Sequence, residues 1–516
     1  MGSTGILEHG ELTRTTRGIP GRSCIFSSRV SGTQGPFSKV SEKICKKSDS
    51  SIVPMKRITT VEGRGGHMSR FRERNTNHTG GDKLVVNGFE GIAKQSATHE
   101  KVQTIMHYVN QETLAEEHRK QQTGKATGID GVTKEQYGEH LDENIEKLLV
   151  KMKSFSYQPQ AVRRKYIPKA GSDKLRPLGI PSYEDKLVQG VMRKVLDQIY
   201  EGKFYDTSYG FREGKSCHQA VRAINQIVMT KKVNFMVDAD IKGFFDNVDH
   251  RWLMKFLEHD IQDKSFLRYI VRFLKAGIVE DMQHHESDKG APQGGLISPV
   301  LANVYLHYVL DMWFALVVKK HCKGEAYIVR YADDFVCFFQ YENEANNFYK
   351  DLEERLAKFS LELSSEKSQI MKFGRFAKQN SKDSRARSFD FLGFTFINGK
   401  TLTGKYRIVY RTSKKKLKAK KQAVKEWLSY NIHGKLSDTI EKLNRKLTGH
   451  YAYYGISGNV QGLWNFYRFI VSAFYKALMR RSQRAYLTWK RYKSLLEKHP
   501  IVRPKIYINV WQPIAS

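Results

Sequence analysis

Two adjacent aspartates set between apolar runs constrain this chain more than any other feature. Tyr331-Ala332-Asp333-Asp334 is preceded by the run Ala326 to Arg330 and followed by Phe335 to Phe339. β-Branched and aromatic residues on both sides of a short polar pair predict two strands joined by a two-residue turn. Both carboxylates would then lie at the tip of a hairpin, where their mutual repulsion requires a cation. We expect a divalent ion there, and Mg²⁺ suits carboxylate oxygens.

A second acidic stretch, Asp238-Ala239-Asp240, follows the apolar run Val233 to Val237. An isolated Asp pair in a hairpin is ordinary turn chemistry. A strand that ends in Asp240 beside the hairpin would instead bring Asp240, Asp333 and Asp334 together around two Mg²⁺ ions. Such a site is typical of nucleotidyl transfer, in which one ion activates the attacking oxygen and the other neutralises the leaving pyrophosphate.

The charge of the chain indicates the kind of partner it binds. Its 516 residues include 87 Lys and Arg against 53 Asp and Glu, a formal charge of +34. With 40% hydrophobic and 12% aromatic residues, the composition is that of folded domains. A positive excess of this size favours a nucleic acid partner. We recognise no run of about 18 apolar residues and no secretory segment, and we expect no membrane partner.

The five cysteines are scattered without a C-x-x-C pair. This pattern indicates free thiols in a reducing compartment rather than a zinc site or a disulfide framework. We therefore expect an intracellular protein. The location that we expect is the bacterial cytoplasm, with association with the nucleoid when the protein is bound to DNA.

Residues 1–95 form a segment rich in Gly, Ser, Thr, Arg and Lys, with few apolar residues at any regular period. We interpret them as a basic, poorly ordered N-terminal extension. A Ser- and Arg-rich, acid-poor start is also typical of an organellar transit peptide, and the sequence does not decide between the two.

Two basic stretches flank the short segment Ala170-Gly171-Ser172-Asp173. They are Arg163-Arg164-Lys165-Tyr166-Ile167-Pro168-Lys169 and Lys174-Leu175-Arg176-Pro177. The pattern predicts two strands joined by a flexible tip. Such a hairpin could fold over a triphosphate, with Lys169 and Arg176 on its phosphate oxygens. A solvated basic edge hairpin is the structural alternative.

Three other segments have a pattern that suits nucleic acid. Ser208-Tyr209-Gly210-Phe211-Arg212 places aromatic rings beside a guanidinium, although this run suits packing equally well. The segment from Gly290 to Pro299 is a Gly/Pro loop whose glycines permit close approach of backbone to a base pair. From Thr412 onward the chain is basic, helical and rich in Tyr and Trp, which is typical of a module that grips RNA.

Taken in order, these motifs resemble a reverse transcriptase, and within that class the group II intron-encoded reverse transcriptases and maturases. The resemblance runs from about Gly124 to Phe396 and continues more weakly to about residue 500. It implies an α+β right-hand polymerase with an antiparallel palm sheet. The implied domains are an N-terminal extension with fingers at 96–230, the palm at 231–412 and a helical thumb or maturase domain at 413–516.

The resemblance also implies roles for individual residues. Asp240 corresponds to the first metal-binding carboxylate, and Asp333 and Asp334 lie in the signature box. The carbonyl of Ile241 becomes a further ligand of the two Mg²⁺ ions, and Lys367 lies near the leaving pyrophosphate. Gln293 and Gly294 belong to the template and nucleotide loop. The expected nucleic-acid contacts come from Arg163, Arg164, Arg212, Tyr331, the primer-grip residues Leu392 and Gly393, and Lys414, Lys415 and Lys416.

Phe245 provides an expectation about the sugar. It follows Asp240 by five residues, and its ring would lie under the incoming ribose and clash with a 2′-hydroxyl. RNA-copying RNA polymerases commonly have an Asp at this position to accept that hydroxyl. We therefore expect dNTP substrates.

The implied function is an RNA-directed DNA polymerase encoded by a group II intron. Its expected partners are intron RNA, an RNA template and a DNA primer or target, and it would assist splicing and copy the intron into cDNA during mobility. One alternative is a domesticated relative in defence or repair. Another is an RNA-binding splicing cofactor with dispensable polymerase activity. No Cys pairs or His-Asn-His cluster follow residue 413, so we expect no endonuclease domain.

Overall fold

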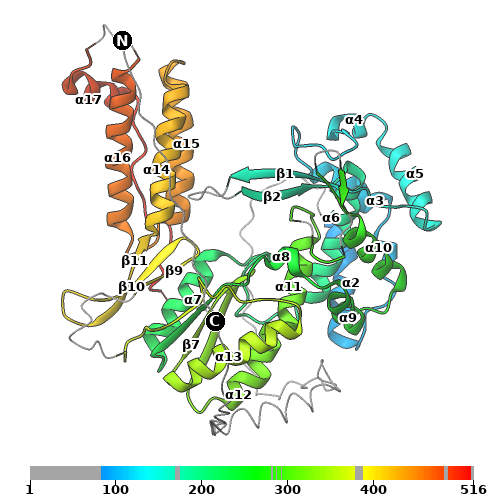
Figure 1. Ribbon diagram of the computed structural model, residues 1–516. Helices are drawn as coiled ribbons and strands as arrows, with labels where there is room; N and C mark the ends of the chain where they lie inside the picture. Colours follow the sequence, from blue (N-terminus) through cyan, green and yellow to red (C-terminus); the bar gives the residue numbers. More distant parts are fainter. Residues whose placement is uncertain are drawn as a thin grey trace, which may run out of the picture. The chain divides into compact units, whose positions relative to one another are not determined.

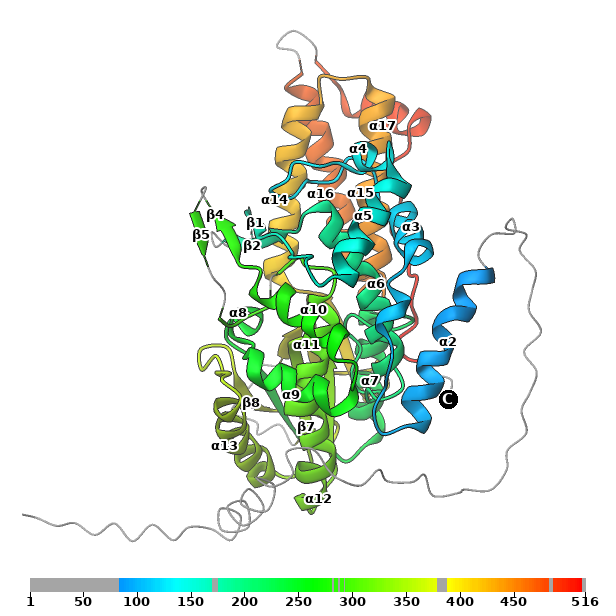
Figure 2. The same ribbon diagram turned by 90° about the vertical axis from the view of Figure 1, so that its right-hand side faces the viewer.

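The structure is a computed structural model that describes residues 83–168, 175–280, 283–285, 288–291, 293–377, 388–481 and 486–512. All of them belong to one compact unit, Gly63–Ser516. Figures 1 and 2 show the helices and strands from two sides. The helices up to residue 275 are α2 (Lys83–Thr98), the 3₁₀ turn η1 (Met106–Tyr108), α3 (Gln111–Lys120), α4 (Lys134–Gly138), α5 (Leu141–Lys153), α6 (Tyr183–Tyr200), α7 (Cys217–Thr230), α8 (Phe244–Asn247), α9 (His250–Asp260) and α10 (Lys264–Lys275).

The remaining elements combine helices with short strands. The later helices are α11 (Ser298–Leu306), the π-helical segments η2 (His307–Asp311) and η3 (Phe314–Val318), α12 (Lys319–His321), α13 (Glu342–Lys358), α14 (Lys414–Asn431), α15 (Leu436–Tyr454), α16 (Val460–Met479) and α17 (Trp489–Lys498). The strands are β1 (Val162–Pro168), β2 (Leu175–Ile180), β3 (Phe235–Ala239), β4 (Ile278–Glu280), β5 (Gln283–His285), β6 (Ala326–Tyr331), β7 (Asp334–Phe339), β8 (Gln369–Lys372), β9 (Ser388–Phe391), β10 (Phe394–Lys400) and β11 (Tyr406–Thr412). The fold therefore mixes α and β structure.

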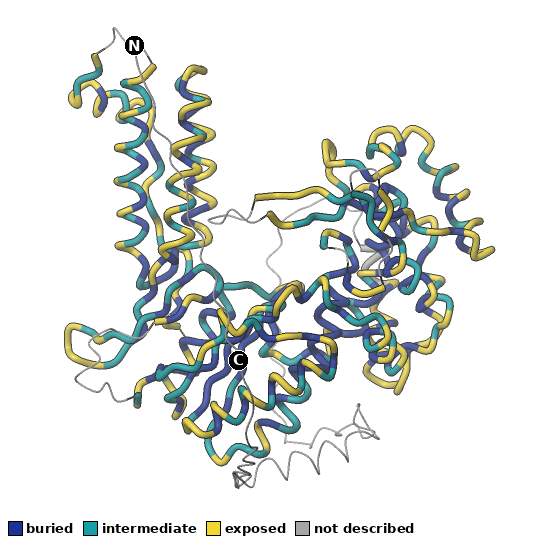
Figure 3. Tube along the Cα trace, in the orientation of Figure 1, coloured by how far each residue is buried: buried dark blue, intermediate teal, exposed yellow. Residues whose placement is uncertain are grey.

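The central sheet has the strand order β6-β7-β3-β8, and all its neighbouring strands are antiparallel. Both faces are covered, so Phe335 to Phe339 are all buried (dark blue in Figure 3). Val336 and Phe338 belong to a core that also contains residues of α7 and of the sheet β11-β10-β9. On the opposite face, the Phe339 ring lies 5.0 Å from the Phe348 ring of α13. A sheet covered on both faces is a rigid support for side chains at its end.

A third sheet, β2-β1-β4-β5, contains the basic hairpin that the sequence predicts. β1 and β2 are antiparallel, with Arg163 opposite Ile180 and Pro168 opposite Leu175. Nearby, α2 is held on α6, since the Ser96 hydroxyl donates to the Ile199 carbonyl at 2.8 Å. The predicted extension, residues 1–95, overlaps with α2, which is helical from Lys83 to Thr98. A buried apolar stripe, including Ile92 at 1% exposure, accounts for the helix.

The helical stretch Ser298–His321 has the length and apolar composition of a membrane span. Its most apolar window is 72% buried inside the fold. It therefore has the character of a core helix, whose two π-helical turns alter the direction of the side chains that follow.

Helices α14, α15 and α16 share a second hydrophobic core, to which Leu428, Leu443 and Phe466 belong. A returning segment, residues 499–512, connects this bundle with the core of the central sheet. Ile508 forms a parallel bridge with Ile456, and Val510 is fully buried in the central core. Contacts from two sides therefore attach the bundle to the sheet.

Candidate active site

The tip of the β6–β7 hairpin carries the predicted carboxylate pair. Tyr331 pairs with Asp334, which leaves Ala332 and Asp333 as a two-residue turn. Ala332 has a φ of 58°, a left-handed conformation that is strained for a residue with a side chain. A Cβ on Gly210 would collide with the Ala332 nitrogen, so only glycine permits this close packing. The predicted hairpin is confirmed, with Asp334 as the first residue of β7.

Asp240 lies beside this hairpin because β3 pairs with β7. Ala239 is opposite Phe335, so extending the antiparallel register by one residue places Asp240 beside Asp334, and the charge of Asp240 acts on that carboxyl. Three acids from two distant stretches of sequence thus meet at one end of the central sheet. The fold therefore brings together, at the candidate site, acidic residues that are far apart in the sequence.

The charges of these acids affect one another. Burial and then the charges of Asp333, Asp240 and Asp238 raise the pKa of Asp334 to about 6, although part of its side chain reaches solvent. Burial, followed by Asp240, also raises the pKa of Asp333. Carboxyls that make one another harder to ionise require a cation to hold all of them charged.

Lys367 supplies one positive charge. Its ammonium forms an ion pair with the Asp240 carboxylate, and backbone bonds hold its loop in place, including Ser364 N to Asp240 O at 2.8 Å. Among the residues that the structure describes, no three His, Cys, Asp or Glu side chains are grouped as a ready cation cage. The Lys367 ammonium is therefore a counter-ion for the Asp240 carboxylate.

The donor set nevertheless fits Mg²⁺. It offers hard carboxylate oxygens from Asp240 and Asp333, and further negative charge at Asp334. Ile241 and Leu363 form an antiparallel bridge of the non-hydrogen-bonded type. In such a pair, the N–H and C=O groups of each residue point away from the partner residue. The Ile241 carbonyl therefore faces the side of β3 that pairs with β7, where the resemblance expects it.

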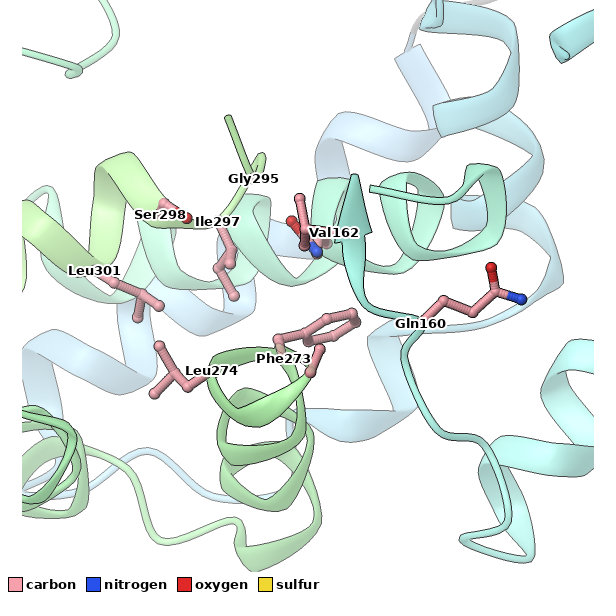
Figure 4. A pocket seen from close by; sticks show the side chains of 10 residues that line it. Gln160, Val162, Phe273, Leu274, Gly295, Ile297, Ser298 and Leu301 are labelled. Atoms are coloured by element: carbon pink, nitrogen blue, oxygen red, sulfur yellow. The ribbon is translucent and has the colours of Figure 1, made fainter. Parts of the chain in front are cut away.

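The expected nucleotide loop, around Gln293 and Gly294, is fixed on the basic hairpin. Gly179 of β2 donates its N–H to the Gln293 carbonyl at 2.5 Å, and a Cβ on Gly294 would collide with the Gly179 carbonyl. Gln189 of α6 accepts the Leu296 N–H at 2.9 Å. Below the loop lies a pocket, lined by Val162, Phe273, Leu274, Ile297 and other residues (Figure 4). Its mostly hydrocarbon lining suits packing rather than a nucleotide.

The basic residues of the hairpin have different surroundings. Arg176 is exposed, and its charge acts on Asp333 to lower the pKa of that carboxyl. Arg164 is paired with Glu280 of β4 at 3.1 Å, and Arg163 is half-buried. Lys169 lies outside the described residues.

Phe245 lies in the short helix α8, which follows Asp240. Its side chain is half-buried, whereas the neighbouring Phe244 is 2% exposed. The Phe245 carbonyl accepts the Ala291 N–H at 2.7 Å, which links α8 to the nucleotide loop. The sugar-selection role remains a prediction.

The expectation that Arg212 contacts nucleic acid is contradicted. Its side chain is 3% exposed and forms an ion pair with Glu201 at 2.8 Å. It also donates to the carbonyls of Tyr205 and Ser208, each at 2.7 Å. The N–H groups of Arg212 are therefore used in bonds within the protein. These bonds stabilise the loop in which Gly210 packs against the β6–β7 hairpin.

The expected primer-grip residues lie in a hairpin formed by β9 and β10. Leu392 and Gly393 form its turn, with φ of 50° and 78°. The Tyr453 hydroxyl donates to the Leu392 carbonyl at 2.9 Å. Two consecutive left-handed residues are typical of a tight two-residue turn, and a residue with a side chain there is strained. Tyr331 packs against the hydrophobic core that includes Val336 and Phe338 of the central sheet. Lys414, Lys415 and Lys416 are exposed at the start of α14.

No role was assigned from the sequence to two residues that the structure places near the site, Asp238 and Arg330. Burial, followed by the charges of Asp240 and Asp390, raises the pKa of Asp238 to about 6. Arg330 is fully buried immediately before the hairpin tip. A charged residue at the end of an apolar strand was the available signal.

Neutralising Asp334 should stabilise the metal-free protein. Since its pKa of about 6 exceeds the ordinary 3.8, the ionised form costs stability above about pH 6, and the cost disappears as the pH falls toward 4. We expect Asp334→Asn to raise the Tm by about 1–3 °C near pH 8 with a chelator present, with the gain vanishing near pH 4. Thermal melts over this range test it against Glu353→Gln, an exposed charge on α13. An equal gain in both variants, or none at pH 8, contradicts the electrostatic account.

Comparison with known proteins gives consistent matches. Residues 167–396 match the family described as "Reverse transcriptase (RNA-dependent DNA polymerase)". The group II intron-encoded protein LtrA of Lactococcus lactis subsp. cremoris is 42% identical over 185 residues, which are 36% of this chain and 31% of the relative. Protein YkfC of Escherichia coli (strain K12) is 33% identical over 269 residues, 46% of this chain and 70% of that protein.

A more distant match is nuclear intron maturase 1, mitochondrial, of Arabidopsis thaliana. It is 26% identical over 119 residues, 21% of this chain and 16% of the relative. The chain spans about a third of the length of the LtrA relatives that it matches.

Proposed function

Since the chain belongs to the reverse transcriptase family, we propose that it is an RNA-directed DNA polymerase encoded by a group II intron, and that it also binds intron RNA to assist splicing. The observation that carries the proposal is the strand register that brings Asp240 beside Asp334, with Asp333 in the adjoining turn. The names of the relatives support the intron origin.

We also propose the right-hand arrangement. The central sheet would be the palm, the β1–β2 hairpin with its neighbouring helices the fingers, and the α14–α16 bundle the thumb. The contact of Tyr453 with the Leu392–Gly393 turn supports this assignment, because it joins the bundle to the expected primer grip.

In the proposed mechanism, Asp240, Asp333 and the Ile241 carbonyl would hold two Mg²⁺ ions, and Asp334 would support the negative charge of the cluster. Such ions, when bound, would supply the positive charge needed to activate a primer 3′-hydroxyl and to neutralise a leaving pyrophosphate. Arg176 binds phosphate oxygens of the incoming nucleotide, and Lys367 moves from Asp240 to the pyrophosphate. Gln293 and Gly294 position the templating base pair, and the Phe245 ring excludes a 2′-hydroxyl.

Primer extension by the purified protein tests the activity. The proposal expects Mg²⁺-dependent extension of a DNA primer along an RNA template with dNTPs, and no extension with a chelator. A protein that binds RNA tightly but does not extend the primer would favour the alternative, a splicing cofactor without polymerase function.

Intron binding should depend on salt. Contacts between lysines and phosphates release counter-ions, so log affinity should fall linearly with log salt, by about 0.7 per phosphate contacted. Changing Lys414, Lys415 and Lys416 to Gln should flatten the slope by about 2. The same change at the exposed Lys320, Lys323 and Lys350, near α12 and α13, is the control. A flat salt response, or an equal effect of both triple variants, contradicts the proposed RNA surface on α14.

A further inference from the structure

A buried arginine, Arg330, contacts the turn formed by Ala332 and Asp333, which we call the catalytic turn. The Arg330 side chain is 0% exposed, and its ion pair with Asp311, also 0% exposed, has N–O distances of 2.8 and 2.5 Å. Asp311 is the last residue of the π-helical segment η2. A π-helical turn shifts the direction of side chains relative to an α-helix and recurs at functional sites.

The remaining donor of Arg330 binds two further groups. Its Nη1 donates to the Ala332 carbonyl and to Asn303 Oδ1, both at 2.9 Å. Ala332 is the left-handed residue of the catalytic turn. Asn303 lies in α11, which begins directly after the nucleotide loop, and its Nδ2 donates to the Gly210 carbonyl at 2.7 Å. Arg330 is therefore connected to the turn, to α11 and, through Asn303, to the loop that packs on the turn.

A buried ion pair is weak grounds for a stability role. Removing two charges from water costs several kcal/mol each, and apolar replacements of the same volume are often as stable. What an apolar pair cannot supply is a planar fork of donors that binds the Asp311 carboxylate, the Asn303 side chain and the Ala332 carbonyl at once. The geometry of the turn, rather than the stability of the fold, depends on that fork.

We propose that Arg330 is a positioning residue that holds the catalytic turn in its strained conformation and couples it to the nucleotide loop through Asn303 and α11. The proposal rests on the proposed polymerase function. Arg330 itself touches neither substrate nor ion, and it acts through the Ala332 carbonyl on the neighbouring Asp333.

Arg330→Lys tests the geometry, because it retains the charge opposite Asp311 but loses the fork. A displacement of about 1 Å in a catalytic group costs about a hundredfold in rate. We expect kcat to fall by about that factor, with an unchanged Kd for primer and template and a higher Mg²⁺ concentration for half-maximal rate. Asn303→Leu, which removes the link to α11, should act in the same direction.

Lys203→Met is the control for a purely structural role. It removes another partly buried ion pair, Lys203–Asp260 at 2.5 Å, which does not involve the turn. The control should lower the Tm while leaving kcat within about twofold. If kcat falls with Tm to the same extent in the control and in Arg330→Lys, the positioning role is contradicted.

A second readout does not require polymerase activity. Hydrogen exchange measured by mass spectrometry should become about tenfold faster in the peptide covering residues 326–339 of Arg330→Lys, with unchanged exchange in α15. This result would support the role even if the wild-type protein extends no primer. Unchanged exchange in that peptide, or a kcat within twofold of wild type, would overturn the proposal.

Discussion

The Asp333→Asn variant is expected to abolish DNA synthesis while the protein remains folded. Asn keeps the volume of the side chain but removes the charge that binds a divalent ion, whose contribution to the transition state is several kcal/mol. The expected loss is at least about a thousandfold in the single-turnover rate of primer extension. The Tm should not fall, because burial and Asp240 already raise the pKa of Asp333 and make its ionised form costly to the fold.

The matched control for this result is Glu353→Gln, which removes one exposed negative charge from α13 and should extend primers at the wild-type rate. Extension by Asp333→Asn at more than a tenth of that rate would contradict a catalytic role for the hairpin.

The Phe245→Ala variant is expected to relax discrimination against ribonucleotides. If the ring excludes a 2′-hydroxyl, removing it should raise kcat/KM for rNTPs, while dNTP use changes less. The ratio of the two values should fall by about ten- to a hundredfold, the range that pocket sterics supply. Steady-state incorporation of dATP and ATP opposite the same template base measures it.

Phe244→Leu is the control for the sugar experiment. Its ring is 2% exposed and packs 5.4 Å from that of Phe245, so the variant alters packing in α8 but leaves the ring of Phe245 in place. The dNTP to rNTP ratio should stay at the wild-type value. An unchanged ratio in Phe245→Ala would show that another group selects the sugar.

Local patterns in the sequence predicted the hairpins well. β-Branched and aromatic residues on either side of Ala332–Asp333 specify strands and turn together, and the basic hairpin β1–β2 was also predicted from two stretches that flank a short tip. The meeting of Asp240 with Asp334 was expected from chemistry alone. Nothing local dictates that pairing, since it depends on strand register across nearly a hundred residues of intervening chain.

The misassigned residues depend on contacts that a linear pattern does not contain. Arg212 has the sequence character of a nucleic-acid contact, yet Glu201 and two backbone carbonyls enclose it. Leu392 lies in the β9–β10 turn, where its carbonyl accepts a bond from Tyr453, a residue 61 positions further along the chain. The buried charge of Arg330 must be paired, and its partner is Asp311. Asp311 lies 19 residues earlier in the chain, in the π-helical segment η2, so no local pattern around Arg330 identifies it.

Binding of Mn²⁺, followed by electron paramagnetic resonance, tests most directly whether the separated acids share ions. The complex with primer, template and a non-hydrolysable dNTP should bind Mn²⁺ tightly. Asp240→Asn and Asp333→Asn should each weaken that binding by at least about tenfold, since even the loss of a group that only supports a metal ligand has an effect of this size. Wild-type Mn²⁺ affinity in both variants would contradict a shared metal site at the end of the central sheet.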